Sequence, residues 1–221
     1  MPGTDAIEQD GVVSVVRLDD LSRAIGVAEA LVAGGVRAIE FTFTNRDAAR
    51  AIEETVAACG DRAVIGAGSV LDAETARVAI LAGAAFVVTP TLRPATIELC
   101  RRYGVPVVVG GFTATELLTA WETGASYVKV FPARVGGPEY IRDLLGPLPQ
   151  LKVVPTGGVT PENAPAFIQA GAVAVALGGN LVDAGSVARG DWSVLTERAR
   201  RLIDMVALTR NPPPKADGGA V

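Results

Sequence analysis

The most informative absence in this 221-residue sequence is histidine, which does not occur at all. Without histidine there is no Ser-His or Cys-His nucleophile pair, no histidine general base and no histidine-containing zinc site. Cysteine is scarce, since Cys59 and Cys100 are the only two, and both lie in patterns typical of helix ends. Free cysteines are commonly buried, so we interpret both as structural. Any chemistry must therefore rest on lysine, carboxylates, arginine, hydroxyl groups or the backbone.

Long apolar runs and a strong charge of one sign are also missing. No uninterrupted apolar run approaches the roughly 18 residues that a bilayer-spanning helix needs. The first ten residues are acidic and lack the charged-then-apolar layout of a secretion signal. Scattered charges sum to a formal net charge of -4, which argues against nucleic acid or a membrane surface as a partner. We therefore expect a cytoplasmic protein with neither of these partners.

The sequence does contain two kinds of segment that alternate along the chain. Short β-branched runs predict buried strands, and stretches rich in Ala, Leu, Arg and Glu with helical spacing follow them. The predicted strands span residues 12–17, 38–43, 63–66, 86–89, 107–109, 127–131, 152–155 and 174–177, and the clearest helices span 21–33, 46–58, 73–81 and 115–123. Eight strand-then-helix units at roughly 25-residue spacing predict parallel pairing in a single (β/α)8 TIM barrel.

An open, doubly wound sheet is the alternative fold. It is disfavoured because the first strand is not followed by a G-x-G-x-x-G turn, and Gly66-Ala-Gly68 supplies only two glycines of that fingerprint. No linker interrupts the chain before the last dozen residues, so residues 1–210 are predicted to form one barrel domain. Residues 211–221 are rich in proline and glycine and are predicted to be a disordered tail.

Only three lysines occur, and one of them lies in an apolar segment, where a charged residue is unusual. Lys215 lies in the predicted tail, and Lys152 begins a strand, where a solvated side chain is the ordinary interpretation. Lys129 lies inside an apolar strand, on one face with Tyr127 and Phe131. Both faces of a barrel strand are covered, so Lys129 must point either into the helix layer or into the barrel interior, and its amine is buried in both cases. Burial lowers the pKa of an amine and leaves it neutral and nucleophilic, the state that a Schiff-base lysine needs.

A carboxylate on the second predicted strand has the same character. Ile39, Phe41 and Phe43 share the face that suits the helix layer, so Glu40 points into the barrel. Desolvation raises the pKa of a carboxyl group toward neutrality, where it can shuttle a proton. The alternative interpretation is structural, with Lys129 and Glu40 only neutralising each other as a buried ion pair.

Glycine pairs follow the last two predicted strands, where barrels often bind a phosphate with backbone N–H groups. Glycine there lets the backbone approach an anion closely. The predicted anion site comprises Thr156, Gly157, Gly158, Gly178, Gly179 and Asn180, the last as a side-chain donor. Arg17, Arg46 and Ser69 follow the first three strands and are candidates to bind a substrate carboxylate.

Three motifs in one order resemble a known family: Gly34-Gly-Val-Arg-Ala-Ile-Glu40, Ile65-Gly-Ala-Gly-Ser-Val-Leu71 and Lys129-Val-Phe-Pro-Ala133. From Val12 to Leu202 the chain resembles the 2-keto-3-deoxy-6-phosphogluconate (KDPG) and 4-hydroxy-2-oxoglutarate (KHG) aldolases. The resemblance implies a barrel without metal or cofactor, usually a homotrimer. It also implies that Lys129 is the Schiff-base lysine, that Glu40 is the acid/base, and that the glycine loops bind phosphate.

Four sites depart from the family pattern: Thr44 for an arginine that binds the pyruvate carboxylate, Ser69 for threonine, Thr89-Pro90-Thr91 for Ser-Pro-Gly, and Asn180 for serine. Arg17 matches a basic position that some relatives use for substrate binding. In this interpretation Arg17 compensates for Thr44, together with Arg46 two residues further on.

The resemblance implies retro-aldol cleavage of a 4-hydroxy-2-oxo acid to pyruvate and an aldehyde through a Schiff base on Lys129. Glu40 takes the 4-hydroxyl proton, and Pro90 and Phe131 line the pocket. Three alternatives stay open. One is the same chemistry on an unphosphorylated or galactonate-type substrate, another is a sugar-phosphate isomerase or epimerase, and the third is a non-catalytic phosphate-binding barrel.

Overall fold

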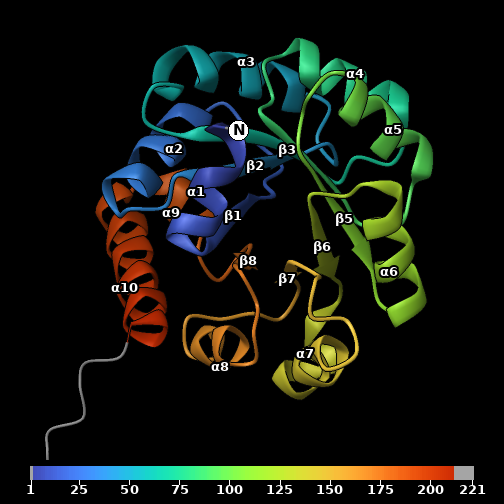
Figure 1. The fold of residues 1–221 in the computed structure, drawn as a ribbon. Helices are drawn as coiled ribbons and strands as arrows, with labels where there is room; N and C mark the ends of the chain where they lie inside the picture. The colour runs from blue at the N-terminus through green and yellow to red at the C-terminus, as the bar shows by residue number, and fades with distance from the viewer. Residues whose placement is uncertain (1, 212–221) are drawn as a thin grey trace, which may run out of the picture.

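A computed structural model describes the backbone of residues 2–211 and the side chains of residues 5–211. Its eight strands form one parallel sheet in the order β7-β6-β5-β4-β3-β2-β1-β8, with helices outside it (Figure 1). The predicted (β/α)8 barrel is confirmed. The predicted tail, apart from Asn211, lies outside the described residues, and the domain boundary at residue 210 stays a prediction.

The strands match the predicted ranges to within two residues at either end. They are β1 (Val12–Val16), β2 (Ala38–Thr42), β3 (Val64–Gly68), β4 (Phe86–Thr89), β5 (Val107–Gly111), β6 (Tyr127–Val130), β7 (Val153–Pro155) and β8 (Val175–Leu177). The helices are α1 (Pro2–Asp10), α2 (Ala24–Ala33), α3 (Ala48–Cys59), α4 (Ala73–Leu81), α5 (Pro94–Arg102), α6 (Ala114–Thr123), the 3-10 helix η1 (Ala133–Val135), α7 (Gly137–Leu145), α8 (Ala164–Gln169), α9 (Ala184–Arg189) and α10 (Trp192–Arg210).

Alternation along the strands sorts the side chains into two cores. The outer core, between sheet and helices, includes Ile39 and Phe41 of β2 and Val128 and Val130 of β6. The inner core fills the barrel and consists of Ile7, Val13, Val15, Ala38, Phe86, Val88, Val108, Tyr127, Val154, Ala174 and Ala176. Glu40 and Lys129 alternate with the outer residues of β2 and β6, and both therefore face the barrel interior. The sequence predicts this direction for Glu40, and for Lys129 it is one of the two that the sequence leaves open.

The two cysteines are buried and unpaired, as expected of structural residues. Cys59 ends α3 and Cys100 lies in α5. Burial raises the pKa of the Cys100 thiol to about 11, so this thiol is protonated at neutral pH. No helix within residues 2–211 is both long and apolar enough to cross a membrane. The cytoplasmic location stays a prediction.

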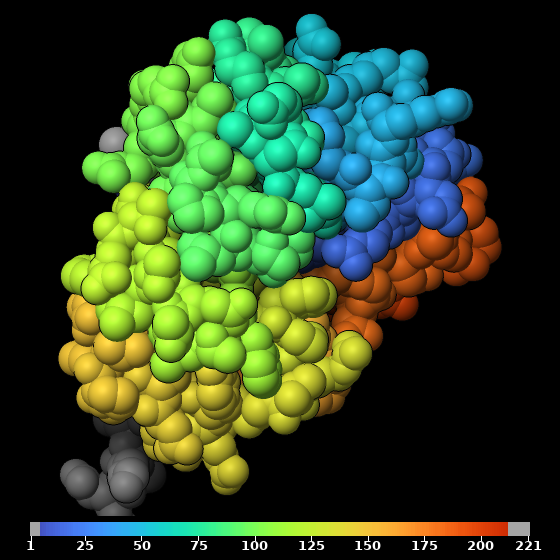
Figure 2. Space-filling model, turned by 90° about the vertical axis from the view of Figure 1, so that its right-hand side faces the viewer, coloured from blue at the N-terminus to red at the C-terminus, as the bar shows by residue number. Residues whose placement is uncertain are grey.

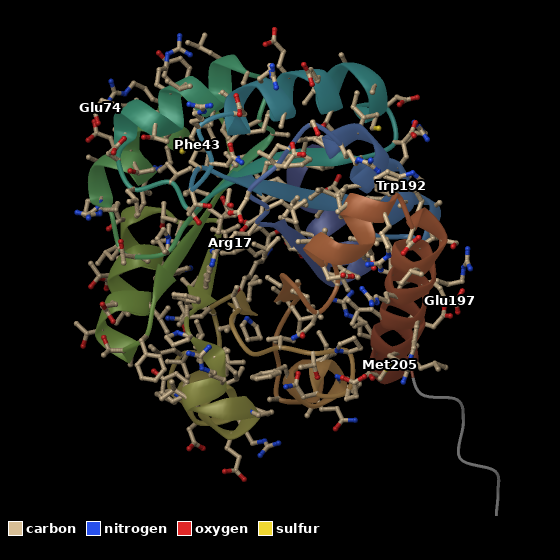
Figure 3. The ribbon with its side chains drawn as sticks, turned by 180° about the vertical axis from the view of Figure 1, so that it is seen from behind. Arg17, Phe43, Glu74, Trp192, Glu197 and Met205 are labelled. Carbon is tan, nitrogen blue, oxygen red and sulfur yellow. The ribbon has the colours of Figure 1, made fainter. Side chains whose placement is uncertain are left out.

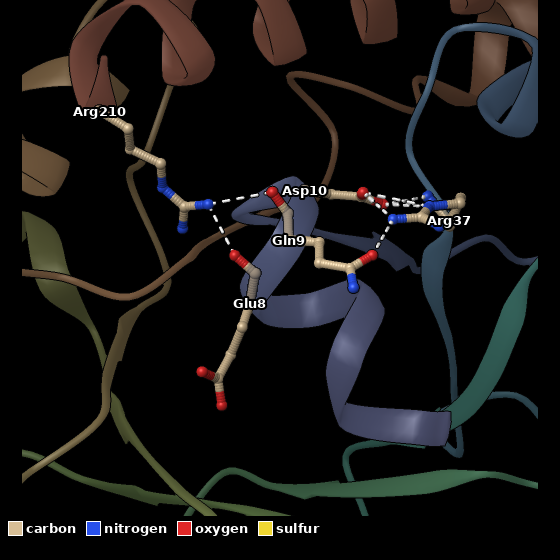
Figure 4. Close-up of polar contacts among 5 residues, drawn as sticks. All are labelled: Glu8, Gln9, Asp10, Arg37 and Arg210. Carbon is tan, nitrogen blue, oxygen red and sulfur yellow. Dashed lines mark hydrogen bonds and ion pairs between the residues drawn. The ribbon is translucent and has the colours of Figure 1, made fainter. Parts of the chain in front are cut away.

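The N-terminal helix α1, which the sequence analysis did not predict, covers one end of the barrel (Figure 1). Its Ile7 is fully buried in the inner core. Arg210 of α10 donates to the carbonyl oxygens of Glu8 and Gln9, and Arg37 pairs with Asp10 (Figure 4). These contacts tie both ends of the described chain to the end of the barrel that is opposite the strands' carboxyl termini.

We expect Ile7→Ala to lower the free energy of unfolding by about 2–5 kcal/mol, because it leaves a cavity under the inner core. Ile25 is 37% exposed on α2, so the matched variant Ile25→Ala should cost less than about 1 kcal/mol. Urea unfolding of both variants measures the difference. Equal costs would show that α1 does not plug the barrel.

The ring of strands is least regular between β7 and β8. Every other neighbouring pair is joined by a ladder, whereas β7 and β8 share only an isolated bridge, between Thr156, which follows β7, and Ala176 in β8. One backbone hydrogen bond, from Val173 N–H to the Val153 carbonyl (3.0 Å), joins the segments at the opposite end. We call this junction between β7 and β8 the seam.

Candidate active site

Lys129 and Glu40 are the two buried charged side chains among residues 5–211. Lys129 on β6 is 5% exposed and Glu40 on β2 is 2% exposed. Three strands, β3 to β5, separate them on one side of the ring, so they face each other across the barrel interior. Within the described chain no ion pair joins them directly, and the lysine amine instead lies 5.3 Å from the centroid of the Phe131 ring. The amine is therefore not held by a carboxylate.

Burial moves the pKa values of these two groups toward neutrality from opposite sides. Desolvation lowers the pKa of Lys129; the Arg17 charge lowers it further, and the Glu40 charge opposes the change. Desolvation raises the pKa of Glu40, while the charges of Lys129 and Arg17 act against that rise. A lysine whose pKa is lowered and a carboxyl group whose pKa is raised are suited to act as a nucleophile with an acid/base partner.

Arg17 and Ser69 meet at the mouth of the barrel. Arg17 follows β1, and its Nη2 donates to Ser69 Oγ over 3.4 Å. Figure 3, seen from the side opposite α1, places Arg17 near the middle of the ring of strands. Ser69 follows β3 and, within residues 2–211, is the one non-glycine residue with a positive φ, 56°. Such backbone strain clusters at functional sites, and here it presents the hydroxyl to the guanidinium.

Arg46 lines the same open pocket as Arg17 and Thr44 but takes no part in the contact between Arg17 and Ser69. Its side chain is 94% exposed, and its one ion pair, with Asp47, is 4.0 Å long. Thr44, which stands where the family has arginine, shares a hydroxyl–hydroxyl hydrogen bond of 2.9 Å with Thr42. Of the two arginines predicted to bind a carboxylate, only Arg17 lies close enough to influence Lys129 and Glu40.

Pro90 and Phe131 line the same mouth, both partly buried. A Cβ on Gly110 would lie 2.3 Å from the Pro90 carbonyl, so β5 approaches Pro90 too closely for any side chain there. A Cβ on Gly157 would lie 3.0 Å from the Phe131 ring. The glycine loop after β7 therefore packs against the ring that contacts Lys129.

Gly68 is a site residue that the sequence analysis missed as such. A Cβ at this position would lie 2.6 Å from Glu40 Oε1, so only glycine leaves room for the carboxylate. The residue stood out within Gly66-Ala-Gly68, but its role depends on the register that pairs it with Thr42, two residues beyond Glu40. Gly68 thus fixes where the Glu40 carboxylate can lie.

We expect Gly68→Ala to lower kcat by about 100-fold while the protein stays folded, because displacing a catalytic group by about 1 Å has that effect. Gly146→Ala is the matched control, since its added Cβ makes only an ordinary contact of 3.4 Å at the end of α7. Steady-state kinetics with circular dichroism test both variants. Full activity in Gly68→Ala would show that the Glu40 position is not critical.

The four carbonyl oxygens of residues 156–159, after β7, all accept hydrogen bonds. Their donors, in chain order, are the N–H groups of Ala133 (2.7 Å) and Arg134 (2.9 Å) and the Nδ2 groups of Asn163 and Asn180 (3.0 Å each). The Asn180 side chain, predicted to bind an anion, is thus engaged with the neighbouring loop. Every carbonyl group of this loop therefore accepts a hydrogen bond from the protein itself.

The N–H groups of Gly158 and Val159 donate to no atom of the described residues, whereas the Gly157 N–H lies at the bridge to Ala176. Gly157 and Gly158 have φ values of 85° and 88°, which a residue with a side chain rarely adopts. Successive free N–H groups in such a turn form a concave anion-binding site, or nest. The loop after β7 therefore has the composition and hydrogen bonding of an anion site.

The loop after β8 repeats this arrangement. The Gly178 carbonyl accepts from the N–H groups of Leu181 (2.8 Å) and Val182 (3.0 Å). Within the described part of the chain, the N–H groups of Gly178, Gly179 and Asn180 have no acceptor. No atom lies within 4 Å of a Cβ built on Gly179, so the space beside the loop is open. Two sets of unpaired donors thus flank the seam.

Comparisons with known proteins agree with this arrangement. A family model described as KDPG and KHG aldolase matches residues 4–198. The 2-dehydro-3-deoxy-phosphogluconate aldolase of Treponema pallidum (strain Nichols) is 37% identical over 205 residues, which cover 92% of this chain and 97% of that protein. The 2-dehydro-3-deoxy-6-phosphogalactonate aldolase of Escherichia coli (strain K12) is 36% identical over 175 residues, 79% of this chain and 85% of the relative.

A solved structure of KDPG aldolase from Legionella pneumophila, with pyruvate captured at low pH as a covalent carbinolamine intermediate, has the same fold. It matches with a TM-score of 0.82 and 27% identity, and the match covers 91% of this chain and 98% of that one. From the family model and the relatives together, the chain belongs to the KDPG and KHG aldolase family and is a class I, metal-independent carbon–carbon lyase with a (β/α)8 fold.

Proposed function

We propose that the protein cleaves a 2-keto-3-deoxy acid that carries a 4-hydroxyl group, giving pyruvate and an aldehyde through a Schiff base on Lys129. The observation that carries this proposal is the buried, unpaired Lys129 amine, whose pKa is lowered by desolvation. A neutral amine is the form that attacks a ketone. Membership of an aldolase family removes the isomerase, epimerase and non-catalytic alternatives.

In the proposed reaction the Lys129 nitrogen attacks C2 of the substrate, and loss of water gives an iminium. Glu40 takes the proton of the 4-hydroxyl group as the C3–C4 bond breaks, which releases the aldehyde. The bonding pair moves toward the iminium nitrogen and forms an enamine. Protonated Glu40 returns its proton to C3, and water hydrolyses the second iminium to free pyruvate and the Lys129 amine. Glu40 and Lys129 thus end in their starting forms.

Arg17 and Ser69 are proposed to hold the substrate carboxylate. The Arg17 guanidinium is a cation at the mouth, in hydrogen-bond contact with the Ser69 hydroxyl, and carboxylates favour such paired donors. Arg46 lines the same pocket as Arg17, but its exposed side chain makes it the weaker candidate for this contact.

We expect Arg17→Met to raise KM by roughly 10- to 100-fold, as loss of a charged hydrogen bond does. It should also move the pH profile of Schiff-base formation to higher pH. The Arg17 charge lowers the pKa of Lys129, so its removal lets that pKa rise, and the neutral amine then appears only at higher pH. Arg46→Met should leave the profile in place. A profile that stays unchanged in Arg17→Met would contradict the assigned position of Arg17.

The N–H groups after β7 and β8 are proposed to bind a phosphate at the far end of the substrate. They supply neutral donors, which suit a phosphate held by a backbone nest. Relatives act on phosphogluconate-, phosphogalactonate- and KHG-type substrates according to their names, so the choice among these is open to experiment.

We expect KDPG or its galactonate epimer to be cleaved with a kcat/KM at least about 100-fold above that of the unphosphorylated 2-keto-3-deoxy acid, because several charge-assisted hydrogen bonds are lost without the phosphate. KHG carries a carboxylate in place of the phosphate, so its kcat/KM shows how well the site accepts a different anion. A coupled assay, in which the released pyruvate is reduced by a second enzyme, measures the rate of cleavage. Equal turnover with and without the phosphate would contradict the proposed phosphate site.

We propose further that the protein is a homotrimer. Several large apolar side chains of α4, α6 and the end of α5 are at least 43% exposed: Val78, Leu81, Trp121 and Tyr103, which directly follows α5. Residues of these helices form the green surface that fills much of Figure 2. An apolar surface of this kind supports contact between copies. Native mass spectrometry tests the proposal, and a monomer at micromolar concentration would refute it.

A further inference from the structure

The two sets of unpaired N–H groups lie on opposite sides of the seam. One set follows β7 and the other follows β8, and in the described chain the strands themselves are joined by one isolated bridge, between Thr156 after β7 and Ala176 in β8. At every other junction of the ring a ladder fixes the spacing of neighbouring strands. A ligand that binds both loops therefore depends on a spacing that the sheet fixes less firmly than at any other junction.

One side chain spans this junction. Asn180 Nδ2, in the loop after β8, donates to the Val159 carbonyl, in the loop after β7, over 3.0 Å. Among the side-chain hydrogen bonds of the described residues, this is the one that joins the two loops. Val159 is 2% exposed, so the acceptor lies on a loop that is anchored in the outer core. The Asn163 amide, in contrast, bonds Gly158 within a single loop.

We propose that Asn180 is a positioning residue, which holds the two glycine loops at the spacing where both bind the same substrate phosphate. This inference rests on the proposed phosphate site. Asn180 acts through the Val159 carbonyl, and its side chain need not contact the substrate. Lys129 lies on β6 and is held by the β5–β6 and β6–β7 ladders. Loss of the Asn180 contact should therefore weaken phosphate binding and leave Schiff-base formation intact.

The test compares Asn180→Ala and Asn180→Asp with the wild type. Aspartate keeps the shape of asparagine and lacks the donor, so it provides a second variant. Asn45→Ala is the matched control, because Asn45 Nδ2 also joins two loops, by donating to the carbonyls of Leu18 (3.1 Å) and Asp19 (2.9 Å). There the β1–β2 ladder fixes the spacing independently.

We expect Asn180→Ala to raise KM for the phosphorylated substrate by roughly three- to tenfold, as loss of one neutral hydrogen bond predicts. Asn180→Asp should raise KM further, because its carboxylate also repels the phosphate. The kinetics of both variants with the unphosphorylated substrate and their trapping of pyruvate by borohydride should match the wild type. In the absence of ligand, amide hydrogen exchange in residues 156–160 should accelerate in both. A residue that only contacts phosphate directly would not change exchange in the free protein. Asn45→Ala should change neither the preference for phosphate nor this exchange.

Unchanged KM and unchanged exchange in both variants, with a wild type that prefers the phosphorylated substrate, would overturn the role of Asn180 alone. Raised KM without faster exchange would also overturn it, by assigning Asn180 as a direct ligand. A wild type with no preference for phosphate would refute the phosphate site and this inference together. Absence of a pyruvate adduct in the wild type would refute the Schiff-base proposal separately.

Discussion

Lys129→Arg should reduce cleavage by roughly 10⁴- to 10⁶-fold, the range seen when a covalent nucleophile is removed. Arginine keeps the positive charge and much of the length of lysine, but its guanidinium is not deprotonated in proteins and does not form a Schiff base. The barrel interior therefore keeps a long, nitrogen-bearing side chain opposite Glu40, while the nucleophile is lost. Initial rates with the preferred 2-keto-3-deoxy acid measure the loss.

Lys152→Arg is the matched control for this experiment. Lys152 is half-exposed at the α1 end of the barrel, where its amine bonds Glu8 at 2.7 Å. Arginine can also make that contact, and surface substitutions generally have small effects. The activity of Lys152→Arg should therefore stay within about twofold of the wild type. Comparable activity of Lys129→Arg and Lys152→Arg would contradict a Schiff base on Lys129.

Glu40→Gln should lower kcat by roughly 10²- to 10⁴-fold, the contribution typical of a general acid/base. Glutamine has nearly the same shape, so the space beside Gly68 stays filled and the fold is kept. The variant should also change how stability depends on pH, because burial raises the pKa of Glu40 in the folded protein.

The direction of that change follows from proton linkage. A carboxyl group whose pKa is raised by folding favours the folded state below its ordinary pKa, and this stabilisation is lost as pH rises through the raised value. Glutamine does not titrate, so the unfolding free energy of Glu40→Gln should gain on the wild type as pH rises from acidic to neutral. The gain has a limit of about 1.4 kcal/mol per pH unit.

Urea unfolding at a series of pH values measures this gain, with Glu98→Gln as the exposed control. Glu98 pairs with Arg102 on the surface of α5, at 3.0 Å. An exposed pair of this kind contributes at most about 1 kcal/mol, so Glu98→Gln controls for the removal of a carboxylate as such. A constant difference between Glu40→Gln and the wild type at all pH values would show that Glu40 has an ordinary pKa in the folded protein.

The barrel and its two central side chains could be predicted from the sequence because local rules govern them. Alternation along a strand decides which face a residue takes, and the outer valines of β6 fix the inward direction of Lys129. The scarcity of lysine made that residue conspicuous. Glu40 followed by the same argument from the phenylalanine and isoleucine around it on β2.

Other features depend on contacts between distant segments, which a single sequence does not encode in a local pattern. Helix α1 has an acidic composition, and its buried Ile7 gives no helical period by itself. Arg46 lies in the loop after β2. No strand alternation fixes the direction of its side chain, which is exposed to solvent. The role of Gly68 depends on strand register, and that of Asn180 on the spacing across the seam.

The central claim is that the Lys129 amine bonds to the ketone of the substrate. Incubation with pyruvate and borohydride, followed by digestion and peptide mass spectrometry, tests it most directly, because reduction makes the Schiff base permanent. The account predicts one reduced pyruvate per chain, on the peptide that contains Lys129, and none in Lys129→Arg. No adduct, or an adduct on Lys152 or Lys215 in its place, would contradict the account.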